Sequence, residues 1–232
     1  MRRQVIAIAA LFASLSASSV SAQITYCGTG EFVEQALDTG VTVYSVAVPK
    51  SHFYDVSSLR CPGARPACPL KAYLIAKNQV LVSAIQDGWA CAWYEGPKAY
   101  TVGWLRTTDL ARETTPAAPL GWVGDWSFDR DSHISITRDK HGGLHVNGDT
   151  VNTGRPSMPS GGFEGDLMVD GPTGIYSAYD AAEAARYKKL FPEDREPTYC
   201  TVKFRRVGRY LIANDGEGCS GMGADFMGVY TR

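Results

Sequence analysis

The sequence lacks the motifs of the common nucleotide-dependent, serine and thiol enzymes. It contains no phosphate-binding loop, no glycine-rich dinucleotide fingerprint between a strand and a helix, and no Gly-x-Ser-x-Gly turn. A papain-like catalytic cysteine precedes its histidine in the same domain, and no histidine follows Cys200 or Cys219. These absences predict no catalytic residues, no cofactor and a role other than catalysis.

Metal-binding patterns and a strong excess of one charge are also missing. No Cys-x-x-Cys occurs, and His141 and His145, which have zinc-ligand spacing for a helix, are separated by two glycines that predict a turn. The net charge of −1 excludes the large basic surplus that nucleic acids and anionic membranes require. We therefore expect no metal site and no nucleic-acid partner.

The long apolar run of the sequence lies at its start. Two arginines precede the apolar stretch 5–15, and a series of small residues ends at Ala22. This order is typical of a secretory signal peptide that is cleaved between Ala22 and Gln23. The run is about half of the ~20 residues that a membrane span needs. We expect residues 1–22 to be removed and the protein to be periplasmic or secreted, with no membrane span and no lipid anchor.

An exported chain favours disulfides, and the sequence contains six cysteines, an even number. They are Cys27, Cys61, Cys68, Cys91, Cys200 and Cys219. The first four precede residue 92 and the last two follow residue 199, so we expect three disulfides that each stay within one half. Cys200–Cys219 is then the pairing left for the C-terminal half, whereas three pairings stay open among the first four cysteines.

A short stretch rich in threonine, proline and alanine, 114–119, divides the chain. It has no large apolar side chain, and its prolines favour an extended linker. We place a boundary there, with one domain at 23–113 and a second at 120–232, and we expect each domain to fold alone.

The first domain contains a series of short strands separated by turns. The β-branched and apolar runs lie at 41–46, 72–75, 79–85, 89–94 and 99–105. Such spacing is typical of a small all-β barrel. Asp87-Gly88-Trp89 and Gly103-Trp104-Leu105 resemble the bacterial SH3-like domain, in which a glycine–tryptophan turn and a later Gly-Trp-hydrophobic strand close a five-stranded barrel. The likeness covers 41–110 and departs from the family in the cysteine- and proline-rich stretch 61–69.

Three aromatic residues of this domain, Trp89, Trp93 and Tyr100, are candidate ligand contacts. Strand alternation and the SH3-like resemblance place Ala90 and Ala92 inside the barrel and the two tryptophans outside it. Exposed aromatic side chains are common in binding strips. The alternative is that they pack under the cysteine-rich loop or against the second domain, because large aromatic side chains are usually covered.

The second domain alternates apolar and polar residues over about eight strands, enough to close an antiparallel barrel whose first and last strands pair. Gly124-x-Trp126 in its first strand resembles lipocalin and avidin barrels and small secreted barrels that inhibit lysozyme. The resemblance implies that a late arginine, Arg232 or Arg209, stacks on Trp126, as in lipocalin-like barrels. The alternative is that Trp126 only fills the barrel bottom while the terminal Arg232 frays.

The sequence predicts a helix over 180–190. Asp180 is a suitable N-cap, Glu183 completes a capping box, and Pro192 ends the helix. Alanines dominate one of its faces. We therefore expect this helix to lie close against the second barrel, over one of its open ends.

These patterns predict an all-β protein: an SH3-like five-stranded barrel, then an antiparallel barrel of about eight strands with one short helix. We expect an exported, non-catalytic envelope binding protein that contacts cell-wall material or another envelope protein. A periplasmic inhibitor or immunity-type protein is an alternative with the same export and disulfides. A cell-wall hydrolase with its site in the second barrel is another, because an aspartate and a glutamate there could converge as a catalytic pair.

Overall fold

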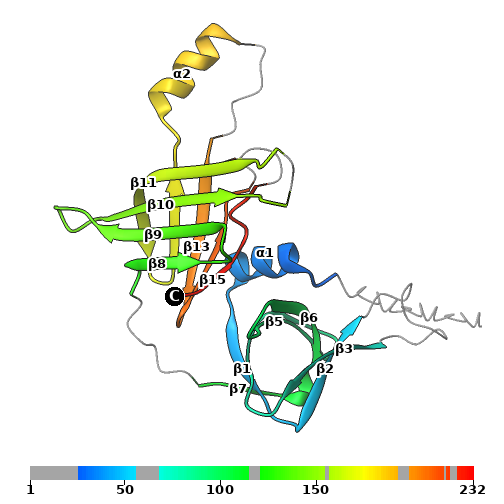
Figure 1. The fold of residues 1–232 in the computed structure, drawn as a ribbon. Coiled ribbons are helices and arrows are strands. Elements are labelled where there is room, and N and C mark those ends of the chain that lie inside the picture. Colours follow the sequence, from blue (N-terminus) through cyan, green and yellow to red (C-terminus); the bar gives the residue numbers. More distant parts are fainter. Residues whose placement is uncertain are drawn as a thin grey trace, which may run out of the picture.

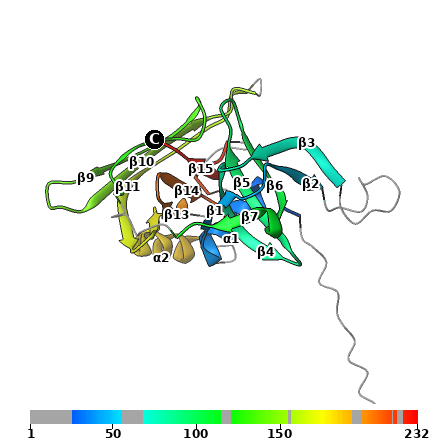
Figure 2. The same ribbon diagram turned by 90° about the horizontal axis from the view of Figure 1, so that it is seen from below.

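The computed structural model describes residues 26–55, 68–114, 121–154, 157–192, 199–216, 218–219 and 224–232. Over these residues the protein is all-β, as predicted, with two antiparallel sheets and two α-helices (Figure 1, Figure 2). The predicted signal peptide, Cys61 and residues 115–119 of the predicted linker lie outside the described residues.

The first sheet curls into an open half-barrel (Figure 1). Its strands are β1 (Thr42–Val46), β2 (Lys50–Asp55), β3 (Cys68–Ile75), β4 (Gln79–Gln86), β5 (Trp89–Glu95), β6 (Tyr100–Arg106) and β7 (Leu110–Arg112). They are hydrogen-bonded in the order β3-β2-β6-β5-β4-β1-β7. Val82, Ala90 and Ala92 belong to the core cluster inside this sheet, so the two alanines point inward as strand alternation predicts.

Over the described residues this sheet has more strands than the five predicted, because β2 and β7 are additional. In β2 a polar residue occupies a buried position: the Ser51 hydroxyl donates a hydrogen bond of 2.7 Å to the Asp109 carboxylate. Asp109 ends a short 3-10 turn, Thr107–Asp109, which leads into β7. The buried serine interrupts the apolar alternation of β2, and β7 is too short to show a period.

The second sheet forms a nearly closed barrel. Its strands are β8 (Gly124–Ser127), β9 (Ser132–Arg138), β10 (Leu144–Val151), β11 (Ser160–Asp170), β12 (Thr173–Ser177), β13 (Thr201–Val207), β14 (Tyr210–Asn214) and β15 (Gly228–Tyr230). Neighbours in sequence are neighbours in the sheet throughout. Ser127 of β8 and Thr231, just after β15, exchange two backbone hydrogen bonds of 2.9 Å each. The predicted contact between the two ends of the sheet is therefore present as one isolated bridge, which leaves the barrel nearly closed.

The interior of this barrel is filled by large side chains. Trp126, Phe204, Phe226 and Tyr230 are fully buried, and the Phe163 ring packs edge-on against Phe226 with the ring centroids 4.7 Å apart. Aromatic rings packed in this way contribute favourable edge-to-face contacts in addition to buried area. The barrel thus encloses a packed core.

Two arginines lie over the ring of Trp126. The guanidinium carbon of Arg232 is 4.0 Å from the ring centroid, and that of Arg206 is 4.3 Å from it. Arg232 also donates hydrogen bonds to the carbonyl oxygens of Gly121 (2.7 Å) and Val123 (2.8 Å). The predicted stacking on Trp126 is present with Arg232, and the alternative of a frayed Arg232 is wrong.

The Gly-x-Trp spacing follows from this contact. Gly124 has φ +148°, and a Cβ built there would lie 2.9 Å from Nε of Arg232. Glycine at this position therefore leaves room for the arginine, and the tryptophan two residues later provides the ring. Arg209, the other predicted partner of Trp126, instead forms an ion pair with Glu95 of the first sheet. Arg206 is a partner that the sequence did not predict.

Helix α1 (Thr29–Thr39) is also absent from the sequence prediction. Phe32, Val33 and Ala36 are fully buried, which is the spacing of one helical face. The helix contacts β4 and β5 of the first sheet and β13, β14 and β15 of the second. Figure 1 shows it between the two sheets.

A core shared by the two halves surrounds α1. It includes Leu81, Trp93 and Trp104 from the first sheet and Ile212 and Val229 from the second. Separating the halves would expose these apolar side chains to water, which costs free energy in proportion to their area. We expected 23–113 and 120–232 to fold alone. The shared core means that each half, if isolated, would expose apolar side chains that are buried in the whole protein.

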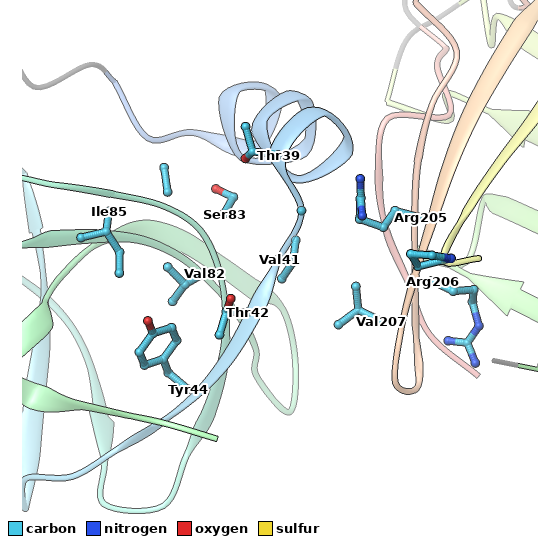
Figure 3. A pocket seen from close by; sticks show the side chains of 13 residues that line it. Thr39, Val41, Thr42, Tyr44, Val82, Ser83, Ile85, Arg205, Arg206 and Val207 are labelled. Atoms are coloured by element: carbon cyan, nitrogen blue, oxygen red, sulfur yellow. The ribbon is translucent and has the colours of Figure 1, made fainter. Parts of the chain in front are cut away.

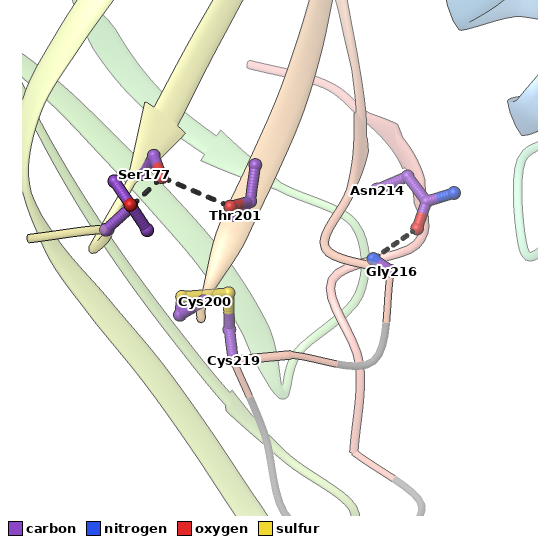
Figure 4. Close-up of a disulfide and its surroundings, with 7 residues drawn as sticks. Ser177, Cys200, Thr201, Asn214, Gly216 and Cys219 are labelled. Atoms are coloured by element: carbon purple, nitrogen blue, oxygen red, sulfur yellow. Dashed lines mark hydrogen bonds between the residues drawn. A yellow bond between two sulfur atoms is a disulfide. The ribbon is translucent and has the colours of Figure 1, made fainter. Parts of the chain in front are cut away.

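The disulfides agree with pairing within each half. Cys27–Cys91 joins the segment before α1 to β5, and Cys200–Cys219 is formed as predicted (Figure 4). Cys68 is also disulfide-bonded. The described cysteines are thus oxidised, as is usual for exported proteins.

Helix α2 (Ala181–Leu190) begins one residue later than predicted and ends where predicted, and the Asp180 carboxylate accepts a hydrogen bond of 2.8 Å from the Ala182 N–H, as an N-cap. The side chain of Glu183 lies outside the described part. The prediction that α2 covers an open barrel end is wrong. The helix extends away from the barrel (Figure 1), and Leu190 at its end is 61% exposed. An alanine face buries too little apolar area to hold a helix against a sheet.

The contact between Trp126 and Arg232 makes a graded prediction for stability. Trp126→Ala is expected to lower the free energy of unfolding by about 3–5 kcal/mol, because it opens a cavity in the core. Arg232→Ala is expected to lower it by about 1 kcal/mol, through loss of the cation–π contact. Urea unfolding measures both. Arg186→Ala, at an exposed position of α2, is the control and should leave stability unchanged. An Arg232→Ala variant as stable as the wild type would contradict a stabilising contact.

The Cys27–Cys91 bond is expected to stabilise the whole molecule. Cys27→Ser/Cys91→Ser frees a loop that spans 64 residues and is expected to cost about 4 kcal/mol. Cys200→Ser/Cys219→Ser frees only 19 residues and is expected to cost about 3 kcal/mol. Thermal melts followed by circular dichroism compare the two. Because the core is shared, each double variant should melt in one transition, and two separate transitions would contradict the shared core.

Candidate functional site

A groove with a volume of about 490 Å³ lies where the two halves meet. One wall comes from β1 and β4, the other from β13, and the C-terminal end of α1 forms the top (Figure 3). Thr42 and Val82 line the first wall, and Arg205 and Val207 line the second. Its size is within the range of small-ligand sites, which occur preferentially between domains.

Arg205 connects the second barrel to α1 at the top of the groove. Its Nη2 donates a hydrogen bond of 2.8 Å to the carbonyl oxygen of Leu37, in the last turn of the helix. A cation at a helix C-terminus is favoured by the helix dipole. The helix ends at Gly40, which has φ +96°, and a Cβ there would meet Nη1 of Arg205 at 3.6 Å. Gly40 thus provides the backbone conformation that ends α1 beside the arginine.

The groove lining combines polar and apolar residues and, over the part of the chain that the structure describes, contains no acidic one. Its lining includes the side chains of Thr39, Thr42, Tyr44 and Ser83 together with two arginines, and none of its 13 lining residues is an aspartate or glutamate. Ser83 donates a hydrogen bond to the Gln35 side chain at 3.2 Å. Within the described part of the chain, the hydroxyls of Thr42 and Tyr44 have no hydrogen-bond partner. Thr42 lines the groove, whereas the Tyr44 side chain packs against the core inside the first sheet, on the other side of β1 from Arg205 (Figure 3).

The guanidinium of the second lining arginine, Arg206, contacts backbone carbonyl oxygens and the Trp126 ring. Its Nη1 donates to the Tyr210 carbonyl (2.7 Å) and its Nε to the Gly121 carbonyl (3.1 Å), with the guanidinium over Trp126. Burial, and then the positive charge of Arg232, lower the pKa of Arg206 to about 10. It stays protonated at neutral pH. Arg205 is therefore the cation that faces the groove.

The aromatic residues predicted as ligand contacts occupy different surroundings. Trp93 is buried and lies edge-on against Tyr210 of the second barrel, with the ring centroids 5.3 Å apart. Tyr100 packs on Phe128 at the same junction, also at 5.3 Å. Trp89 lies apart from them, against Tyr54 and Arg106. Trp93 and Tyr100 thus help to join the halves, which was the alternative left open by the sequence.

A second hollow, of about 340 Å³, lies at one end of the second barrel and is acidic. Asp129, Asp131 and Asp225 line it. Asp129 and Asp225 accept hydrogen bonds from backbone N–H groups of their own loops, at 2.8 and 3.1 Å. A hydrogen bond from Thr153, opposed by some desolvation and assisted by Arg130, lowers the pKa of Asp131. A glycosidase acid needs the opposite shift, so this hollow does not provide a proton donor at Asp131.

A third hollow, of about 330 Å³, is mainly apolar and lies on the outer face of the second barrel. Met168, Ile175 and Phe204 line it, with Leu37 of α1 on one side. Among the described residues, no group of three or more histidine, cysteine, aspartate or glutamate side chains is placed to hold a metal ion. His145 instead contacts the Glu164 carboxylate at 3.2 Å.

Comparison with protein-family models, with curated proteins and with solved structures finds no match to this chain. In the part of the chain that the structure describes, no helix has the length and apolar character needed to cross a membrane. The site is therefore defined by its own geometry, and the groove between the halves is the candidate with the clearest set of available polar groups.

The two arginines that connect the halves are expected to differ in their contribution to stability. Arg205→Ala removes a half-buried hydrogen bond to Leu37 and is expected to lower the free energy of unfolding by about 1–3 kcal/mol. Arg209→Ala removes an exposed ion pair with Glu95 and is expected to cost less than about 1 kcal/mol. Urea unfolding at matched ionic strength tests this order. A larger loss for Arg209→Ala would contradict the role of Arg205 in holding α1.

Proposed function

We propose that this protein is an exported, non-catalytic binding protein of the cell envelope, periplasmic or secreted, that contacts cell-wall material or another envelope protein. The observation that carries the proposal is the groove between the halves, with Thr42 of β1 on one wall and the Arg205 cation of β13 on the other. The signal-peptide pattern of residues 1–22 and the oxidised state of the described cysteines support export.

The junction between the halves is held by several contacts. This favours a binding function over a catalytic mechanism that needs the two halves to move. The shared core around α1, the Cys27–Cys91 bond and the Arg205 contact with Leu37 hold both groove walls in place. A preformed site loses less conformational entropy when its ligand binds. The groove is therefore suited to holding a ligand without a large change of shape.

We further propose that the first half is an SH3-like domain and the second a lipocalin-like barrel. The glycine–tryptophan patterns at Trp89 and Trp104 support the first proposal, and the stacking of Arg232 on Trp126 supports the second. The packed interior of the second barrel favours a site outside it, since Phe163, Phe204 and Phe226 occupy the space that a ligand would need.

Two other functions are distinguished by particular features. A cell-wall hydrolase would use the acidic hollow of Asp129, Asp131 and Asp225, where the lowered pKa of Asp131 suits the base of a catalytic pair and not its proton donor. An inhibitor or immunity-type protein would share the export and disulfides and would bind one protein tightly instead of a polymer. The binding experiment separates these functions.

The test is sedimentation of residues 23–232 with a purified bacterial cell-wall preparation, in parallel with capture of proteins from a periplasmic lysate. Binding to either material is expected, and Thr42→Trp, which fills the groove, should abolish it. Thr137→Trp places the same side chain at an exposed position of β9 and is the control. Binding that survives Thr42→Trp would remove the groove from the proposal. Release of reducing sugars, lost in Asp131→Asn, would instead support the hydrolase.

A further inference from the structure

We propose that the groove binds an anionic ligand, with Arg205 holding its carboxylate or phosphate group and Thr42 lining the facing wall. This inference rests on the proposed binding function and names the chemical class of the ligand. It is argued from the charge of the lining, the state of Arg205 and the nature of the groove walls.

The charged residues of the described lining are all positive. Among the described residues, two arginines and no acidic residue line the groove, and Arg206 contacts Trp126 and two carbonyl oxygens instead. The other nearby arginine of this hairpin, Arg209, has a carboxylate partner in Glu95. Within the described residues, Arg205 has none. A cation without a counter-ion in a groove attracts an anion from solution.

Arg205 also retains hydrogen-bonding capacity. Leu37 takes one of its N–H donors, and Nε is buried without a partner among the described residues. A guanidinium has five N–H donors in a planar fork that matches a carboxylate or a phosphate. A bound oxygen within reach of this unused donor would remove the cost of leaving it unsatisfied.

The end of α1 reduces this attraction but does not cancel it. The carbonyl groups at a helix C-terminus carry roughly half a negative charge in total, and this lies next to Arg205. The guanidinium carries a full positive charge, so a net positive charge of about half an elementary charge remains at the top of the groove. The helix end therefore positions the arginine while leaving it able to bind an anion.

The groove walls strengthen the interaction. Val41, Val82 and Val207 lie between the polar groups of the lining (Figure 3). Apolar walls lower the local dielectric constant, so a charge pair there is stronger than one on an open surface. The volume of about 490 Å³ suits a ligand the size of a sugar acid or a short acidic peptide.

The experiment uses two sugars that differ in one charged group. N-acetylmuramic acid carries a carboxylate that N-acetylglucosamine lacks, and inorganic phosphate serves as a probe for the phosphate source. Each is titrated into residues 23–232 and followed by amide chemical shifts. Saturable shifts at β1, β4 and β13 are expected with N-acetylmuramic acid or phosphate, and none with N-acetylglucosamine.

Matched variants test the role of charge. Thr42→Glu places a carboxylate in the groove and is expected to weaken binding about tenfold or more, whereas the neutral Thr42→Gln has the same size and should weaken it much less. Arg205→Lys keeps the charge but not the fork and should weaken binding severalfold. Thermal melts establish that each variant is folded. These substitutions leave the Cys27–Cys91 bond and the buried face of α1 unchanged.

Several results would overturn the inference. Equal binding of the charged and neutral sugars, equal effects of Thr42→Glu and Thr42→Gln, or no saturable shift with either anion would each do so. Cell-wall or protein capture that is lost in Thr42→Trp but retained in Thr42→Glu would leave the proposed function standing and remove the anionic ligand. Capture that fails for the wild type would remove the proposed function, while the titrations would still report on the groove.

Discussion

The packing of α1 between the two sheets is the contact on which the rest of the molecule depends. Phe32, Val33 and Ala36 fill the space between the sheets, and the helix is held at both ends. The Cys27–Cys91 bond anchors its start to the first sheet, and Arg205 of the second barrel binds a carbonyl of its last turn. A short helix has little stability alone, so this tertiary packing is what forms it. The helix in turn fixes the distance between the two walls of the groove.

The second barrel is closed by an electrostatic arrangement as well as by hydrogen bonds. Arg206 and Arg232 both lie over Trp126, and each repels the other. This cost, and the desolvation that lowers the pKa of Arg206, are offset by backbone carbonyl acceptors and by the aromatic ring. The C-terminal residue is thereby held against the first strand. Gly124 makes this possible because a side chain there would collide with Arg232.

Two aromatic residues of the first domain have a structural role in the whole molecule, because they pack at the junction between the halves. Trp93 and Tyr100 are typical of a binding strip when the first domain is considered alone. In the whole molecule they contact Tyr210 and Phe128 of the second half. The groove beside these contacts is lined in part by polar residues, among them Thr42 and Arg205. Binding capacity therefore lies in the groove beside the aromatic contacts.

Strand alternation, turn residues and cysteine positions were sufficient to predict the all-β class, most strands, the Cys200–Cys219 bond and the bounds of α2 to within one residue. The late arginine on Trp126 was suggested by the resemblance of Gly124-x-Trp126 to lipocalin-like barrels, and not by the spacing itself. These features depend on neighbours along the chain or on pairing rules that apply to any barrel. The tertiary structure alone decided that α2 lies apart from the barrel, that Trp93 is buried and that the halves share a core. It also decided the groove, because Arg205 and Leu37 are 168 residues apart in sequence and meet only when both sheets pack on α1.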